Sequence, residues 1–366
     1  MNRPDGMNDK LILHSQLHDC HITRRSLLLG TAGALTTLAL PGLASPKRSF
    51  SYQNPITEGI RGGIRDAQIV PDGDKYHLVG GMPPFWHGDT PGIRIFTSDN
   101  LLSWGNERML IDRSALDPSV WYYDRFWAPE IHIIRSRYYL LFNARNESKK
   151  YHAAHGCAVA VADKVDGPYR VLTQNKPLTG GNDLTFFEDD DGTVYAFWNA
   201  QKVIRGSRLD VANMSLVAQQ ELFYTGPVNA WDSIGIEGAF VIKRNGIYYM
   251  FYSSWSRGYE IGYATAKHPL GPWRKHPGNP IYGAQDPELC KRHSTQYTGD
   301  PDFPFKAVGH NEVFTGPDGG LWLSCHGIMK RGPHAGTPYL VIDPIRFKHG
   351  EIKVDGPTFS PQTVTW

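Results

Sequence analysis

The sequence contains few cysteines, and their spacing fits neither disulfides nor a zinc site. Only four of the 366 residues are cysteine, and one of them, Cys20, lies in the N-terminal segment. The remaining Cys157, Cys290 and Cys325 are odd in number and widely spaced, which excludes a disulfide framework and a zinc-binding pattern. We therefore expect these three thiols to be buried structural residues.

The chain also lacks an excess of charge of one sign. Its 38 Lys and Arg residues face 36 Asp and Glu residues, which gives no electrostatic footprint for nucleic acid. No glycine-rich phosphate loop opens a helix, and no nicotinamide or flavin fingerprint is present. We expect no nucleic-acid partner and no required cofactor.

The long apolar run of the sequence lies near its N-terminus. The segment Thr23-Arg24-Arg25-Ser26-Leu27-Leu28-Leu29 resembles a twin-arginine export signal, and an apolar stretch to Leu40 and the small-residue sequence Gly42-Leu43-Ala44 follow it. The stretch is too short for a spanning helix of about 20 residues. We predict that residues 1–45 are a twin-arginine signal peptide and that the protein is periplasmic or secreted, without membrane association once the signal is removed.

A repeated pattern fills the rest of the chain. Five times, a short apolar run that begins with an acid or a histidine is followed by a turn and an aromatic-rich strand. The runs are Asp66–Val70, Glu130–Ile134, Asp183–Phe187, Glu237–Val241 and His310–Phe314. The aligned aromatic residues Tyr76, Tyr138, Tyr195, Tyr248 and Trp322 are separated by 62, 57, 53 and 74 residues.

Such a period is typical of a propeller, in which four-stranded blades surround a central channel. Turn sequences such as Asp190-Asp191-Gly192 and Arg244-Asn245-Gly246 separate the paired runs, as β-hairpins require. We predict one all-β domain over residues 46–366, a five-bladed β-propeller, in which residues 46–60 form a strap and residues 280–307 form an irregular loop. If each polar residue lies on the innermost strand, all five meet in the channel.

Three of these residues are acids in different blades, Asp66, Asp183 and Glu237. Glycoside hydrolysis needs two carboxyl groups across the scissile bond, which stand about 6.5–9.5 Å apart in inverting enzymes. One must stay ionised as the base, and the other must have a raised pKa to protonate the leaving oxygen. A third carboxylate would raise that pKa by repulsion. The alternative is that the acids only satisfy backbone amides in the channel.

Several tryptophans lie close in sequence to these acids and could present ring faces to sugars. The alternative for each is core packing between blades. They are Trp86, Trp121, Trp127, Trp198, Trp231 and Trp255.

The chain resembles glycoside hydrolase family 43, whose five-bladed propellers act on plant-wall arabinans and xylans. The resemblance covers about residues 60–347. The matching segments are Arg65-Asp66-Ala67-Gln68-Ile69, Phe126-Trp127-Ala128-Pro129-Glu130, Asn182-Asp183-Leu184-Thr185-Phe186, Ile236-Glu237-Gly238-Ala239 and Gly309-His310.

The resemblance implies a role for each acid. Asp66 would be the general base that activates water, Glu237 the general acid, and Asp183 the group that orients Glu237 and raises its pKa. His310 would lie at the centre of the channel, where it contacts a calcium ion or a water cluster in many relatives. Glu130 would support the site or contact sugar. With His310, we expect Trp127, Glu130, Trp198 and Trp255 to bind the substrate.

The sequence departs from the family where proline usually follows the acids, since Ala67, Leu184 and Ala239 stand there. We expect an inverting hydrolase that acts on an oligo- or polysaccharide through α-L-arabinofuranosyl or β-D-xylosyl linkages. Two alternatives remain open: a neighbouring propeller glycosidase of the fructosidase or anhydrogalactosidase kind, and a carbohydrate-binding propeller without turnover. The Trp-Met-Asn-Asp-Pro stretch expected of a fructosidase is absent.

Overall fold

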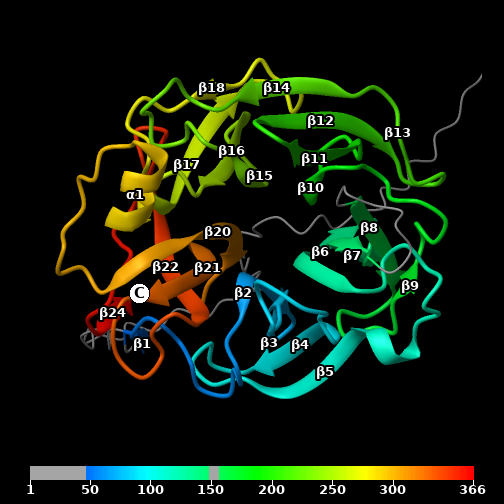
Figure 1. Ribbon diagram of the computed structural model, residues 1–366, viewed down its shortest axis with the longest axis horizontal. Coiled ribbons are helices and arrows are strands. Elements are labelled where there is room, and N and C mark those ends of the chain that lie inside the picture. Colours follow the sequence, from blue (N-terminus) through cyan, green and yellow to red (C-terminus); the bar gives the residue numbers. More distant parts are fainter. Residues whose placement is uncertain (1–46, 148–155) are drawn as a thin grey trace, which may run out of the picture. The chain divides into compact units, whose positions relative to one another are not determined.

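Five antiparallel sheets surround a central channel in the computed structural model, which describes residues 47–147 and 156–366 (Figure 1). The predicted signal peptide, residues 1–45, lies outside the described residues. The prediction of an all-β, five-bladed propeller is confirmed. Ser49–Trp366 form one unit by their internal contacts.

The blades follow one another along the chain, each beginning with its innermost strand. Blade I comprises β2 (Arg65–Asp72), β3 (Lys75–Gly81), β4 (Gly92–Ser98) and β5 (Gly105–Asp112). Blade II comprises β6 (Arg125–Ile134), β7 (Arg137–Arg145), β8 (Gly156–Ala162) and β9 (Arg170–Val171). Blade III comprises β10 (Asn182–Glu188), β11 (Val194–Ala200), β12 (Val203–Asp210), β13 (Ser215–Leu216) and β14 (Gln220–Tyr224). Blade IV comprises β15 (Glu237–Arg244), β16 (Ile247–Ser254), β17 (Gly258–Ala266), β18 (Arg274–Lys275) and β19 (Tyr282–Gln285). Blade V comprises β20 (Phe305–Thr315), β21 (Leu321–Met329), β22 (Pro338–Lys348) and β23 (Glu351–Val354).

Each of the five polar residues lies on an innermost strand, as the repeat predicts. Figure 1 shows β2, β6, β10, β15 and β20 nearest the centre of the ring. Each pairs with the aromatic-rich strand that follows it through a tight hairpin.

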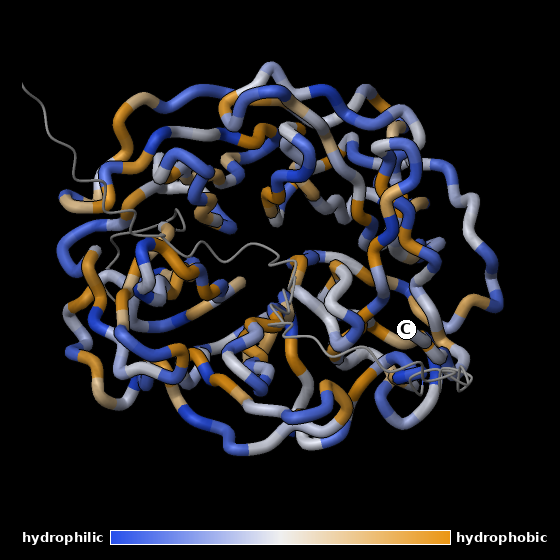
Figure 2. The backbone as a smooth tube through the Cα atoms, turned by 180° about the vertical axis from the view of Figure 1, so that it is seen from behind, coloured by the Kyte–Doolittle hydropathy of each residue, from blue (hydrophilic) through white to orange (hydrophobic). Residues whose placement is uncertain are grey.

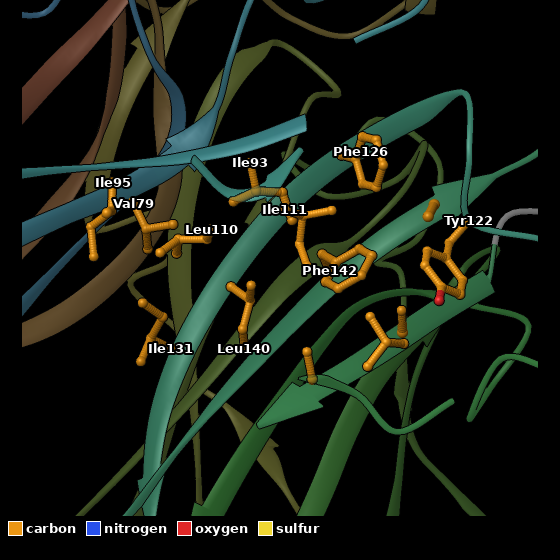
Figure 3. Close-up of a cluster of buried hydrophobic side chains, with 14 of the residues drawn as sticks. Val79, Ile93, Ile95, Leu110, Ile111, Tyr122, Phe126, Ile131, Leu140 and Phe142 are labelled. Carbon is orange, nitrogen blue, oxygen red and sulfur yellow. The ribbon is translucent and has the colours of Figure 1, made fainter. Parts of the chain in front are cut away.

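Apolar side chains fill the spaces between neighbouring blades. Five buried clusters are present in the described part of the chain, one for each pair of adjacent blades. Figure 3 shows the cluster between blades I and II, where Ile95 and Val79 face Leu140 and Ile131. Hydrophobic segments accordingly recur all around the ring (Figure 2). The aromatic residues at the strand starts are therefore mostly core residues.

The predicted loop over residues 280–307 is only partly irregular. It contains β19 and the helix α1 (Pro287–His293), which Asp286 caps at the N-terminus by accepting a hydrogen bond from the Glu288 amide. The prediction missed this helix because a single seven-residue helix carries little periodicity. Cys157, Cys290 and Cys325 are free and buried, as expected. No helix in the described residues has the length and apolarity needed to cross a bilayer.

The two ends of the propeller sequence meet beside blade V. The predicted strap contains β1 (Ser49–Tyr52), which pairs with β24 (Gln362–Thr365). Beneath this pair, the fully buried Asp343 of β22 accepts hydrogen bonds from the Tyr52 hydroxyl at 2.8 Å, the Tyr282 hydroxyl at 2.6 Å and the Thr358 hydroxyl at 2.6 Å. One carboxylate thus joins the N-terminal strap, blade IV, blade V and the C-terminal segment.

Replacing Asp343 should weaken the closure of the ring. We expect Asp343→Ala to lower the free energy of unfolding by roughly 3–5 kcal/mol, because it leaves several buried hydroxyls without an acceptor. Chemical denaturation measures the change. The control is Asp355→Ala, which removes an exposed carboxylate paired with Arg346 and should cost less than about 0.5 kcal/mol. Equal effects of the two substitutions would contradict this account.

Candidate active site

Every innermost strand contains the same irregularity, a β-bulge. The pairing register of each inner strand shifts there, and one residue adopts positive φ. These residues are Asp66 (53°), Ala128 (41°), Asp183 (53°), Gly238 (59°) and His310 (58°). We call them the bulge residues. A bulge bends its strand and turns a side chain in a new direction, and such bulges concentrate at the rims of closed sheets and beside active sites.

Four bulge residues touch one another around the channel. Asp66 Oδ1 lies 3.4 Å from His310 Nδ1, and the Gly238 amide donates to Asp183 Oδ2 at 3.2 Å. A Cβ atom on Gly238 would lie 3.3 Å from the His310 ring, so glycine is required both by the space and by the positive φ. The bulges therefore bring blades I, III, IV and V to one site.

Asp66 is held as an ionised carboxylate. It is 5 % exposed, and Arg65 Nε lies 3.5 Å from its Oδ1. Burial alone would raise the pKa of Asp66, but the charges of His310 and Arg65 hold it below its ordinary value. Asp66 is therefore ionised, and its Oδ1, which accepts no hydrogen bond within the described residues, is free to take a proton from a ligand or water.

His326 of β21 fixes the backbone at Asp66. The Asp66 amide donates to His326 Nδ1 at 3.2 Å, so this nitrogen is an acceptor and the imidazole is neutral. Burial lowers the pKa of His326 to about 3, which agrees with that tautomer. The 3.4 Å approach of the same nitrogen to Asp66 Oδ1 is therefore not an ion pair.

Asp183 is held by three neighbouring groups. Asn143 of β7 donates to Asp183 Oδ1 at 2.7 Å and accepts from the Asp183 amide at 2.8 Å. The Gly238 amide donates to Oδ2, and the Asn199 amide, oriented to donate, reaches the same oxygen at 3.2 Å. Burial raises the pKa of Asp183. Its bonded oxygens make it a positioning group rather than one that exchanges protons with a ligand.

Glu237 keeps its proton to a much higher pH than an ordinary glutamate. Burial, followed by repulsion from the Asp183 carboxylate, raises its pKa to about 7. Unlike Asp66 and Asp183, Glu237 keeps part of its surface exposed. The Tyr259 hydroxyl donates to Glu237 Oε1, which leaves Oε2 to carry the proton. Glu237 is thus an accessible acid beside a buried carboxylate.

His310 and Tyr259 connect the two acids. His310 Nδ1 lies 3.2 Å from the Tyr259 hydroxyl and 3.4 Å from Asp66 Oδ1. Burial opposes protonation of His310, but the surrounding carboxylates of Asp66, Asp183 and Glu237 hold its pKa above the ordinary value. A chain of polar groups therefore runs from Asp66 through His310 and Tyr259 to Glu237.

Glu130 does not occupy the position that the sequence repeat predicts. The bulge residue of β6 is Ala128, and Glu130 lies two residues further along the strand, as Glu312 does beyond His310. Both glutamates are buried, and His132 Nε2 lies 2.8 Å from Glu130 Oε2. Glu130 thus belongs to a second layer of the channel, and its expected role in supporting the site stays a prediction.

The second layer has the donor set of a cation site. Ligand atoms of Glu130, His310 and Glu312 lie within 4.8 Å of one another. Glu130 Oε1, Glu312 Oε2 and His310 Nε2 accept no hydrogen bond from the other described residues, and burial and the neighbouring Glu130 carboxylate raise the pKa of Glu312. Buried carboxylate oxygens without partners suit a hard cation such as Ca²⁺. A second set, Asp183, Glu237 and His310, suits it less well because its carboxylates already accept hydrogen bonds.

The predicted tryptophans fall into two groups. Trp127 is half-buried, with the Arg125 and Arg145 guanidinium groups 4.8 and 5.3 Å from its ring. Trp255 is also half-buried and packs over Gly235. Trp198 is 1 % exposed within the cluster between blades II and III, so its expected contact with substrate is wrong. Its side chain points into an interblade core because both faces of β11 pack against neighbouring blades, Trp198 on one side and Phe197 on the other.

The sequence motifs missed several residues that shape the site. They are Arg65, Asn143, Asn199, Tyr259, Glu312 and His326. Three of them, Asn143, Asn199 and His326, lie on the second strands of blades II, III and V. A polar residue near the end of an otherwise apolar second strand, as in Asn143 and His326, is the signal that could have identified them.

Comparison with known proteins places the chain in a family. The profile described as Glycosyl hydrolases family 43 matches residues 52–352, which include all five blades. The chain belongs to this family. The expected resemblance is confirmed, and the fructosidase and anhydrogalactosidase alternatives are set aside.

The individual relatives are distant. Xylosidase/arabinosidase 43B of Humicola insolens is 23 % identical over 291 residues, which cover 74 % of this chain and 48 % of the relative. Beta-D-galactofuranosidase xynD of Aspergillus niger is 27 % identical over 245 residues, 61 % of this chain and 62 % of the relative. The chain thus spans about half to three-fifths of these relatives. The crystal structure of a thermostable family-43 glycoside hydrolase superposes with a TM-score of 0.67 at 28 % identity, covering 85 % of this chain and 98 % of that one.

The protonation of Glu237 should make stability depend on pH. A carboxyl whose pKa is raised in the folded state stabilises the fold below the unfolded pKa of 4.5, and this contribution is lost as pH rises through about 7. Glu237→Gln keeps an acceptor for Tyr259 without the charge. In metal-free buffer, the variant should gain roughly 1–3 kcal/mol over wild type at pH 8 and almost nothing at pH 4.5.

Urea denaturation at the two pH values measures this difference. Glu58→Gln, at an exposed glutamate, is the control and should show no pH-dependent gain. A Glu237→Gln difference that is the same at both pH values would show that Glu237 is not held protonated by its surroundings.

Proposed function

We propose that the chain is an inverting glycosidase that hydrolyses α-L-arabinofuranosyl or β-D-xylosyl linkages of plant-wall glycans. The observation that carries the proposal is the contrast between two acids in one channel: Asp66 lies beside Arg65 and His310, which lower its pKa, whereas Glu237 is buried near Asp183, and its pKa is raised. Opposite pKa shifts in neighbouring carboxyl groups identify a base and an acid. The names of the relatives, which include xylosidases and an arabinosidase, support the substrate class.

The residues act in one displacement. Asp66 takes a proton from a water molecule while the water oxygen bonds to the anomeric carbon. The bond from that carbon to the leaving oxygen breaks, and Glu237 donates its proton to that oxygen. Asp183 keeps the pKa of Glu237 high, and Tyr259 orients its carboxyl group. After turnover Asp66 is protonated and Glu237 ionised, and proton exchange with solvent restores both.

We also propose that Glu130, His310 and Glu312 hold a divalent cation in the second layer. Bound there, the cation would compensate the negative charge of the channel carboxylates. In the metal-free protein, protonation of His310 would supply that compensation. The paired arginines and the apolar run before Leu40 support a further proposal, export by the twin-arginine route.

Hydrolysis of two substrate types tests the catalytic roles. We expect Asp66→Asn to lower kcat/KM by about 10²–10⁴-fold on both 4-nitrophenyl glycosides and unactivated oligosaccharides, because both need the activated water. Glu237→Gln should cost much more on the oligosaccharide, since nitrophenolate leaves without a proton. Glu58→Gln serves as the matched control.

Two outcomes would contradict the proposal. A wild type that cleaves neither aryl α-L-arabinofuranoside, aryl β-D-xyloside nor a polysaccharide panel would make the chain a carbohydrate-binding propeller. Full activity of Asp66→Asn or Glu237→Gln would instead show that the acids are assigned wrongly.

Calcium should stabilise the chelator-treated protein. At a concentration about 100-fold above Kd, we expect Ca²⁺ to raise Tm by roughly 5 °C. Glu312→Gln should lose the response because it removes a charged oxygen ligand, while Glu58→Gln should keep it. Thermal unfolding followed by circular dichroism measures the shift. An unchanged wild-type Tm at 10 mM Ca²⁺ would contradict the cation site.

A further inference from the structure

A groove with a volume of about 510 Å³ and several polar residues along its wall crosses the edge of blade III. It begins at Asn182 and Asn199 and reaches Glu221 and Tyr224, with Gly180 and Lys202 along its wall. We call it the blade III groove. None of the catalytic roles described above uses its outer part.

The strand register shows how the groove runs. Asn182 of β10 pairs with Asn199 of β11, which pairs with Ile204 of β12, and Ile204 pairs with Phe223 of β14. Tyr224 is the next residue, at the end of β14. Strands lie about 4.8 Å apart, so three steps carry the groove roughly 14 Å outward from the inner strand. This is longer than one sugar ring.

The inner end of the groove adjoins the acid side of the catalytic site. Asn182 directly precedes Asp183, and the Asn199 amide reaches Asp183 Oδ2 at 3.2 Å. Ligand atoms of Asp183 and Glu237 lie within 4.8 Å of each other and of His310. Because the general acid protonates the leaving oxygen, the leaving group must lie on the side of Glu237 and Asp183. The groove extends from that side.

The outer end presents a fixed aromatic residue. Tyr224 is 55 % exposed, an unusual exposure for a tyrosine at a strand end. Its hydroxyl donates to Glu221, and the Arg205 guanidinium donates to the other oxygen of the same carboxylate at 2.8 Å. Glu221 therefore restrains the ring before any ligand arrives. Polar side chains at Gln201 and Lys202 are exposed beside it and can bond to hydroxyl groups.

We propose that the blade III groove binds the sugars on the leaving-group side of an oligosaccharide substrate, with Tyr224 as the outer contact. The inference rests on the proposed hydrolase function and adds to it a substrate class: chains that continue beyond the scissile bond rather than single glycosides. An aromatic face next to fixed polar groups is the arrangement that binds a sugar ring, which has both an apolar face and a rim of hydroxyls.

Gly180 offers a way to close the groove without touching the acids. A Cβ atom there meets nothing within 4 Å, and its backbone does not adopt positive φ, so a side chain is accepted without strain. Gly180→Phe would place a ring in the groove, while Tyr224→Ala would remove the outer contact. The two substitutions disturb different ends of one feature.

The test compares kcat/KM for an unsubstituted trisaccharide with kcat/KM for the 4-nitrophenyl glycoside of the same sugar. We expect Tyr224→Ala to lower the ratio of the two values about 3- to 10-fold, through KM for the trisaccharide. Gly180→Phe should lower it at least as much, and Tyr224→Phe should restore most of it because the ring remains. The control is Val228→Ala, since Val228 is 86 % exposed in the next loop and does not line the groove.

An unchanged ratio in both Tyr224→Ala and Gly180→Phe would overturn the groove while leaving the hydrolase function intact. A fall in kcat on both substrates without a change in their ratio would show a structural effect and would also overturn it. A wild type that cleaves neither substrate would overturn the proposed function itself, and the groove inference with it.

Discussion

The positive-φ bulge on the inner strands is the constraint on which the site depends. A regular strand would point alternate side chains along the blade, and the acids of different blades would not meet. The bulge turns Asp66, Asp183 and His310 toward one another, at a cost of about 1–3 kcal/mol for each strained residue that is not glycine. At Gly238 the absence of a side chain leaves room for the His310 ring, and the backbone amide donates a hydrogen bond to the Asp183 carboxylate. The ring closure at Asp343 and the interblade cores hold the blades rigid enough to maintain this strained arrangement.

The electrostatic surroundings give the three acids different pKa values. Asp66, Asp183 and Glu237 share one channel, where burial alone would protonate all three. Asp66 lies beside Arg65 and His310, which hold it ionised, whereas Glu237 lies beside Asp183 and keeps its proton to a much higher pH than an ordinary glutamate. His310, whose pKa the surrounding carboxylates raise against the effect of burial, contacts both Asp66 and Tyr259, so it couples the two acids. The blade III groove begins beside Asp183, which adjoins the partly exposed Glu237. The leaving group of a substrate would therefore lie on that side of the channel.

The repeat in the sequence predicted the propeller, the innermost strands and the three acids, because apolar runs, turns and aromatic strands are local signals. It failed at Glu130, which precedes its aromatic residue by 8 positions where the bulge residue Ala128 precedes it by 10. An alanine carries no chemical signal, so the nearest acid was aligned in its place. Trp198 failed for a different reason, because both faces of β11 pack against neighbouring blades, so a side chain on either face enters a core. The partners of His326, Asn143 and Tyr259 lie on neighbouring blades, so a local pattern can mark these residues but cannot say what they contact.

The account predicts that water attacks directly from the Asp66 side while Glu237 protonates the leaving group, so one displacement reverses the anomeric configuration. Proton NMR of the first sugar released from whichever aryl glycoside is cleaved tests this most directly. Aryl β-D-xyloside should release α-xylose first, and aryl α-L-arabinofuranoside should release the β-anomer first, before mutarotation mixes the two. Release of the sugar with its original configuration would contradict the account, because retention requires a covalent intermediate that Asp66 acting only as a base does not form.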